Sequence, residues 1–92
     1  MAACRVRVLR WRGIPAQVKV VPDGARAVSR QLDERWQREI DRVAMREGLV
    51  GTDAYLEGWT WAEEEAREGD PAEIAADVVA ELEATWGAVD GR

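Results

Sequence analysis

CRVRVLRWRGIPAQVKVVP, residues 4–22, is the stretch of sequence that decides the fold. Residues 4–11 alternate between polar and apolar side chains and are rich in valine, which predicts a β-strand. Residues 16–22 continue in the same way and predict a second strand. The link Arg12-Gly13-Ile14-Pro15 suits a turn, so the two strands are expected to form an antiparallel hairpin.

A turn, a shorter strand and a helix are predicted after the hairpin. Pro22-Asp23-Gly24 is a strong turn signal, and residues 26–32 then predict a third strand. Asp33 is placed to cap a helix that runs from about residue 34 to 47, and Gly48 is placed to end it. The apolar residues of this helix form one stripe: Trp36, Ile40, Val43 and Ala44.

The next segment is less regular. Thr52 or Asp53 is placed to cap a short turn of helix through Leu56. We prefer a strand for residues 57–66, because an extended chain puts both tryptophans of this segment on one side. A helix is the alternative, because the run of glutamates favours it.

The clearest local signal predicts the last helix. Asp70 is placed as its N-cap, with Pro71 at the first position and Glu73 at the third. The helix is predicted to reach Trp86, with apolar residues at steps of four, and Gly87 is expected to end it. The last five residues are predicted to be frayed.

Together these elements predict one α+β domain over residues 1–92. We expect a small two-layer architecture, in which two amphipathic helices pack on one face of a short antiparallel sheet. A chain of 92 residues holds one hydrophobic core.

Composition narrows the class of protein. No run of about 18 apolar residues is present, and the N-terminus has no apolar signal-peptide region, so neither membrane insertion nor secretion is predicted. The single cysteine, Cys4, excludes an intramolecular disulfide and suits a reducing compartment. We therefore predict a cytoplasmic protein.

Charge is divided unevenly along the chain. Residues 1–46 contain 11 Lys and Arg against 5 Asp and Glu, whereas residues 47–92 contain 2 against 13, which gives the net charge of −5. The preferred interpretation is that the two halves pack together and their fields partly cancel. The alternative is a basic face that meets an acidic partner.

The sequence argues against an enzyme. It has no histidine, and Ser29 and Lys19 are its only serine and lysine, so no nucleophile–base pair can be assembled. One cysteine without histidine makes a zinc site implausible, and the glutamates at 63–65 lack the spacing of a calcium loop. We predict no catalytic residue, no metal and no cofactor.

Tryptophan is the unusual component, with five in the chain. Trp36 and Trp86 lie on the apolar stripes of their helices and are predicted to be core residues. Trp11, Trp59 and Trp61 are either core residues or anchors for a partner or a base. On the first strand, Arg5, Arg7, Leu9 and Trp11 would share one face, which suits a nucleic-acid single strand, although the acidic second half opposes this.

Three blocks of sequence carry a resemblance. They are Trp11-Arg12-x-Ile14-Pro15-Ala16-Gln17-Val18, then Arg35-Trp36 with Ile40-Asp41 and Ala44-Met45-Arg46, then Thr52-Asp53-Ala54-Tyr55-Leu56-x-x-Trp59. In this order they resemble a bacterial family of virulence factor domains, related to a domain of the conserved virulence factor C proteins. Asp33 departs from the family pattern, where proline is common, but either residue starts a helix.

The resemblance implies a partner rather than a reaction. It implies an accessory or adaptor subunit beside folate and corrinoid one-carbon enzymes, such as methylenetetrahydrofolate reductase and methyltransferases. The family name does not make the chain a toxin.

The residues of these blocks allow two interpretations of their own. In the first, the hairpin simply docks on the loop before Tyr55. In the second, Arg12, Gln17, Asp53 and Tyr55 meet beside Trp59 in a polar pocket that holds an anion or a partner's backbone.

We therefore expect a non-catalytic accessory module that binds a protein. The alternatives are a small anionic ligand or, less readily, single-stranded nucleic acid on the Arg/Trp face of the sheet. The candidate contact residues are Trp11, Arg12, Gln17, Asp53, Tyr55, Trp59 and Trp61.

Overall fold

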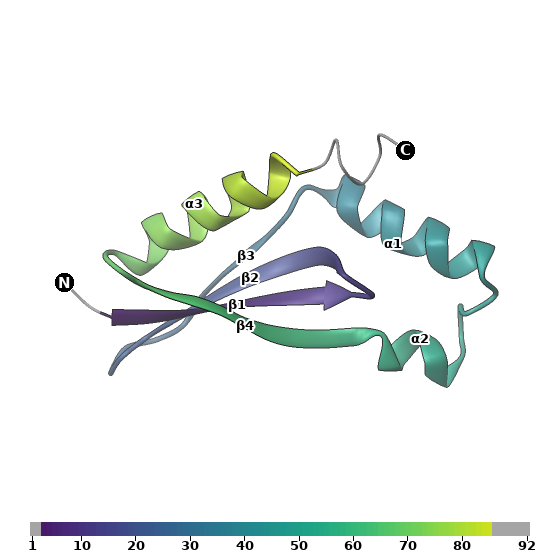
Figure 1. The fold of residues 1–92 in the computed structure, drawn as a ribbon, viewed down its shortest axis with the longest axis horizontal. Helices are drawn as coiled ribbons and strands as arrows, with labels where there is room; N and C mark the ends of the chain where they lie inside the picture. Colours follow the sequence, from purple (N-terminus) through teal and green to yellow (C-terminus); the bar gives the residue numbers. More distant parts are fainter. Residues whose placement is uncertain (1–2, 86–92) are drawn as a thin grey trace.

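A computed structural model describes residues 3–85 and contains one four-stranded antiparallel sheet (Figure 1). Its strands are β1 (Ala3–Trp11), β2 (Ile14–Pro22), β3 (Val28–Gln31) and β4 (Trp59–Glu68), and their order in the sheet is β3-β2-β1-β4. The predicted hairpin, β1 with β2, therefore forms the centre of the sheet.

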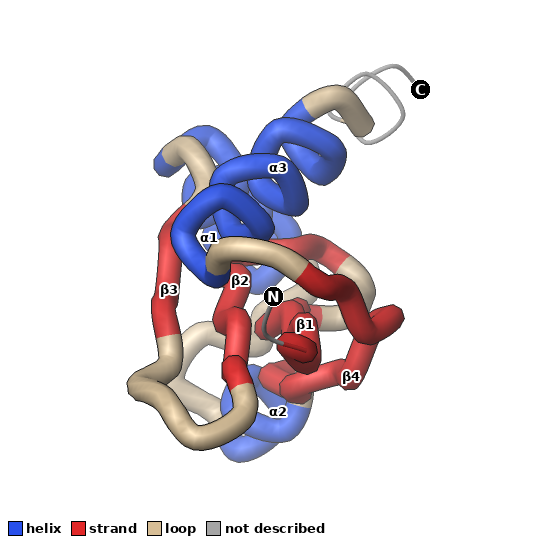
Figure 2. Tube along the Cα trace, turned by 90° about the vertical axis from the view of Figure 1, so that its left-hand side faces the viewer, coloured by secondary structure: helices blue, strands red, loops and turns tan. Residues whose placement is uncertain are grey.

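Over the same residues the chain also forms three helices: α1 (Glu34–Arg46), α2 (Asp53–Glu57) and α3 (Pro71–Glu83). Figures 1 and 2 both show α1 and α3 on one side of the strands and the short α2 on the other. The α+β class and the packing of the two long helices on a small antiparallel sheet are as the sequence predicts.

The hairpin turn is tighter than predicted. Trp11 pairs with Ile14, so the loop is only Arg12-Gly13, and both residues have positive φ, 48° and 89°. Two such residues make the turn whose twist matches that of paired strands. Ile14 and Pro15 consequently belong to β2 and not to the turn.

A bulge in β2 follows directly. Leu9 pairs with Gln17 but Arg10 pairs with Pro15, so Ala16 is the extra residue. The pairing of β3 with β2 begins only at Gln17 and does not reach Pro15. The missing N–H of Pro15 therefore interrupts no hydrogen bond between β2 and β3.

The ambiguous segment is a strand. β4 pairs with β1 from Ala3 to Trp11, and this ladder outweighs the helix preference of the glutamate run. It begins at Trp59 because α2 and Gly58 occupy the residues before it. The third strand is shorter than predicted and covers only Val28–Gln31.

The helix caps follow the sequence. The Asp33 carboxylate accepts from the Arg35 N–H at 3.0 Å, and that of Asp70 accepts from the Glu73 N–H at 3.1 Å. Gly48, at φ 69°, follows α1 as predicted. However, α3 ends at Glu83 and not at Trp86; Trp86, Gly87 and the last five residues lie outside the described range.

The main core lies between the sheet and α3. Its buried side chains come from alternate positions of the hairpin, from α3, from the start of α1 and from the link before it: Cys4, Val6, Val8, Val18, Val20, Leu32, Trp36, Ile74, Ala75 and Val78. Since successive residues of a strand point to opposite faces, the odd-numbered residues of β1 up to Leu9 point away from α3. We call that side the outer face of the sheet.

Ion pairs link the basic and acidic halves of the chain. Pairs that cross between the halves in the described part of the chain include Arg10–Glu64, Arg12–Glu47 and Arg35–Glu83. This supports the interpretation in which the opposite charges of the halves meet within one folded domain.

Candidate functional site

The outer face is where register gathers polar and aromatic side chains. Gln17 of β2 pairs with Leu9 on one side and with Gln31 of β3 on the other. Leu9 in turn pairs with Trp61 of β4. Directly paired residues point to the same face, so these four side chains form one row across the sheet.

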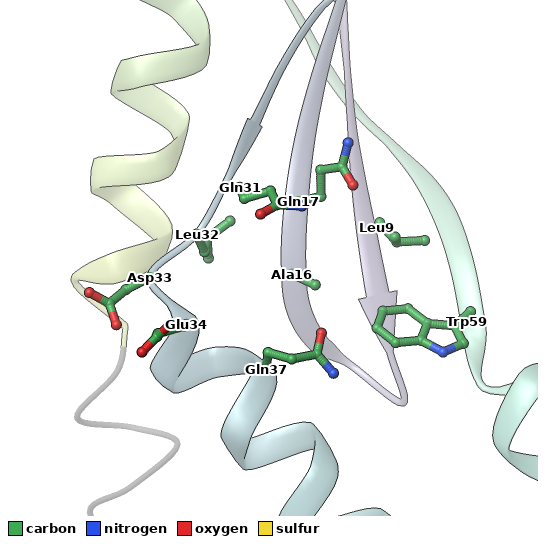
Figure 3. Close-up of a pocket in the computed structure, with 9 residues that line it drawn as sticks. All are labelled: Leu9, Ala16, Gln17, Gln31, Leu32, Asp33, Glu34, Gln37 and Trp59. Carbon is green, nitrogen blue, oxygen red and sulfur yellow. The ribbon is translucent and has the colours of Figure 1, made fainter. Parts of the chain in front are cut away.

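A hollow of about 320 Å³ opens beside this row, at the edge of the sheet where β3 ends and α1 begins (Figure 3). Leu9, Ala16 and Leu32 give it apolar walls, and Trp59 closes one side. Its other lining residues are Gln17, Gln31, Asp33, Glu34 and Gln37. Its volume is within the range of small-molecule sites, roughly 300–1,000 Å³.

The amides of this hollow are available for a ligand. Within residues 3–85, no hydrogen bond ties the side chain of Gln17 or Gln31 to another residue, whereas Gln37 donates to Asp41 at 3.0 Å. The two acids are already engaged, since Asp33 caps α1 and Glu34 pairs with Arg38. The groups left to recognise a ligand are therefore neutral amides beside an indole.

Two cations lie next to the hollow. Arg7 and Lys19 pair directly across β1 and β2, one position beyond the row on the same face. The Arg7 guanidinium carbon lies 5.6 Å and the Lys19 ammonium 5.8 Å from the centroid of the Trp61 ring. We call Arg7 and Lys19 the cation pair, and Trp61, which is 39% exposed, is its aromatic neighbour.

Trp11 is placed in the interior. It is 0% exposed and belongs to a second core cluster with Ile40 and Ala44 of α1. Its indole N–H donates to the Tyr55 carbonyl oxygen at 2.8 Å, and its ring lies 5.6 Å from the Tyr55 ring. Trp11 therefore joins the hairpin to α1 and α2 and offers no surface to a partner.

The other predicted residues do not share one cavity. Gln17 and Trp59 line the hollow, Tyr55 lines a depression beside α1, and Arg12 lines a shallow one near Glu47. Asp53 is exposed in the first turn of α2. Some predicted residues do meet in pairs. The Tyr55 and Trp59 rings lie edge to face at 6.2 Å. The Arg12 guanidinium carbon lies 5.5 Å from the centroid of the Trp11 ring.

Substitution of Gly58 by alanine is expected to lower the free energy of unfolding by about 1–3 kcal/mol. A Cβ atom at Gly58 would lie 2.6 Å from the Trp11 indole nitrogen, so the indole must move and lose its bond to Tyr55. Urea denaturation of single and double variants measures this. The loss should shrink in a Trp11→Phe background, where the indole nitrogen is absent; an equal loss in both backgrounds would contradict the clash.

Cysteine, metal and membrane features add no second site. Cys4 is buried in the main core. Among residues 3–85, no three His, Cys, Asp or Glu side chains gather in a way that would hold a metal ion. In the same range, no helix has the length and apolar character to cross a bilayer.

Sequence reasoning missed several residues of the outer face. Gln31 and Gln37 come from different elements and meet Gln17 only through the pairing of β2 with β3 and the docking of α1. The alternation within the hairpin could have identified part of this face, because it places Gln17, Lys19 and Arg7 on the same side of the sheet.

The resembling blocks of sequence meet in space. Trp11 and Ile14 of the first, Ile40 and Ala44 of the second, and Tyr55 and Trp59 of the third all belong to the second core cluster. A family model described as "Virulence factor" matches residues 9–89, nearly the whole chain. No curated protein and no solved structure matches the chain.

Proposed function

The chain belongs to the virulence factor family, and from that premise we propose that it is a non-catalytic accessory module that binds a protein partner. The supporting observation is an exposed apolar patch where α1 and α2 meet. Met45 is 72% exposed and Val50 61%, and with Tyr55 they line an open depression of about 620 Å³. We call these three residues the helix-end patch.

The composition of the helix-end patch favours a protein partner. Contiguous exposed apolar surface with a polar rim marks interaction sites in soluble proteins. Asp41 lines the same depression, and Arg46 is exposed beside Met45, so charged groups border the apolar centre. Methionine adapts to varied contacts, and a half-buried tyrosine is a typical anchor.

A non-catalytic role fits the titratable groups. Histidine is absent from the sequence, and Cys4 is buried. A hydrogen bond from Arg67 lowers the pKa of Glu81, and the pKa of Glu83 is also lowered. Both carboxyl groups are thereby kept ionised, whereas an acid catalyst at neutral pH needs a raised pKa.

The family resemblance suggests where to look for the partner. We propose a bacterial cytoplasmic system, with folate and corrinoid one-carbon enzymes as the first candidates. The tagged protein would be used for capture from a nuclease-treated lysate of its own bacterium, followed by mass spectrometry and by binding measurements with each purified candidate.

The double variant Met45→Glu/Val50→Glu is expected to capture the partner at least about tenfold more weakly than wild type, because its charges would be buried in an apolar contact. Both side chains are largely exposed, so the fold should keep its melting temperature. Ala80→Glu, on the exposed side of α3, is the matched control and should capture normally. Equal capture by all three proteins, or by none, would refute the proposal.

A further inference from the structure

We propose that the outer face of the sheet binds a 5′-nucleotide, with the base in the hollow beside Trp59 and the phosphate at the cation pair. The residues that carry this inference belong to the sheet and the start of α1. None of the residues that would contact the nucleotide belongs to the helix-end patch, so the inference stands apart from the proposed protein interaction and can fail without it.

The cation pair brings two like charges together, and an anion would relieve their repulsion. Arg7 and Lys19 lie directly opposite each other on the two central strands, and like charges in that position destabilise a sheet. The Trp61 ring attracts both cations and offsets part of the repulsion. A phosphate accepts hydrogen bonds from guanidinium and ammonium groups together, and therefore suits the pair better than a neutral group.

The hollow has the chemistry of a base site. Trp59 offers an indole that is held edge to face against Tyr55, so a planar ring can stack on an already oriented partner. Gln17 and Gln31 each carry an amide that can donate and accept at once. Glutamine pairs with the edge of adenine in this way.

Leu9 connects the two halves of the site. It lines the hollow, pairs with Trp61 and lies two residues from Arg7 on the same face. Two residues along a strand span roughly 7 Å. The sugar of a nucleotide would bridge such a distance between a base beside Trp59 and a phosphate at Arg7.

A single nucleotide fits the charge of the molecule better than a long strand. The net charge is −5, and residues 47–92 contain 13 acidic residues against 2 arginines. A polyanion that extends past the cation pair would meet this acidic half and be repelled. The shared chemistry is nonetheless the nucleotide unit, which a free nucleotide and a single strand both supply.

Titration of the isotope-labelled protein by amide NMR spectroscopy would test the site with defined probes. We expect 5′-AMP to shift the side-chain amides of Gln17 and Gln31 and the indole N–H of Trp61 saturably. Adenosine, which lacks the phosphate, should bind at least about tenfold more weakly. Inorganic phosphate alone should shift resonances near the cation pair and leave the Gln31 amide unchanged.

Matched variants separate the site from general charge. The double variant Arg7→Gln/Lys19→Gln should bind AMP no better than adenosine, whereas Arg26→Gln/Arg46→Gln removes the same charge elsewhere and should bind AMP normally. Gln17→Leu should weaken AMP and adenosine alike, because it removes a base contact. The melting temperature of each variant shows whether it is folded.

The source of the nucleotide is decided by a hexamer of deoxyadenylate. Tighter binding of AMP than of the hexamer identifies a free nucleotide, and tighter, salt-sensitive binding of the hexamer identifies a single strand. Both results support the site. Absence of saturable binding by both probes, or equal AMP affinity in the two charge variants, would overturn it.

Discussion

Substitution of Trp11 by alanine is expected to lower the free energy of unfolding by about 3–5 kcal/mol, the range for large aromatic deletions in a core. Trp11 is fully buried and touches three parts of the fold: α1 through Ile40, α2 through Tyr55 and the backbone at Gly58. Alanine would leave a cavity where the hairpin joins both helices. For a domain whose total stability is roughly 5–14 kcal/mol, this is a large fraction.

Two further variants serve as comparisons. One changes Trp11 to a smaller aromatic residue, and the other removes a tryptophan elsewhere in the sheet. Trp11→Phe keeps an aromatic ring but removes the bond to the Tyr55 carbonyl, and should lower stability by about 1–3 kcal/mol. Trp61→Ala removes the same residue type from a partly exposed site and should lower it by about 1 kcal/mol or less. Urea denaturation measures all three variants. A Trp11→Ala loss no larger than that of Trp61→Ala would contradict the role of Trp11 as the joint of the fold.

The hairpin shows how far local pattern predicts this fold. The alternation of residues 4–11 and 16–22 predicted both central strands and their pairing, because one face had to be buried. The caps at Asp33 and Asp70 were readable because each acts within three residues. No local feature, however, marks Arg12 as a residue with positive φ. The predicted turn therefore wrongly included Ile14 and Pro15.

The candidate site was less accessible to sequence reasoning because it depends on several registers at once. Trp11 and Trp61 both belong to strands with alternating patterns, yet α1 covers one and leaves the other partly exposed. The bulge at Ala16 and the docking of α1 decide which side chains border the hollow. Contacts of this kind join segments that are far apart in the chain, and the pattern of a single sequence does not show which distant segments meet.

The family blocks show the same distinction between core and surface. Residues in all three blocks share the second core cluster, so the packing around Trp11 accounts for part of each block. Gln17 and Met45 also lie in these blocks but face a hollow and an open depression respectively. Packing in the second core cluster does not account for these two residues, and each belongs to one of the two functional proposals.

Substitution of Glu83 by glutamine is expected to lower the free energy of unfolding by about 2–4 kcal/mol at pH 7. The Glu83 carboxylate accepts three bonds from the start of α1: from the Asp33 N–H at 2.7 Å, the Trp36 indole at 2.7 Å and Arg35 at 2.9 Å. An acid at the end of α3 faces an unfavourable helix dipole, but it lies here at the N-terminus of α1, where the dipole is favourable. Glutamine has one acceptor oxygen and would turn an N–H group toward these donors.

The same contact should make stability depend on pH in a defined direction. Burial on its own would raise the pKa of Glu83, but the bonds from Asp33, Trp36 and Arg35 outweigh it, and the pKa is lowered. The unfolded chain therefore binds this proton more readily, since an unfolded glutamate has a pKa of about 4.3. The stabilisation is fully present above that value and is lost as the pH falls through the lower pKa of the folded protein.

Urea denaturation of wild type and Glu83→Gln between pH 7 and pH 3 tests both parts of this prediction. The difference in unfolding free energy should be largest at pH 7 and should shrink below about pH 4. Glu34→Gln is the matched control: its ion pair with Arg38 is exposed, and its loss should change stability by about 0.5 kcal/mol or less. If the Glu83 difference stayed constant with pH, its carboxylate charge would not be what holds α3 to α1. If Glu34→Gln were equally destabilising, the loss of any glutamate charge near α1 would be enough to explain the effect. The bond from Trp36 to Glu83 would then not be its cause.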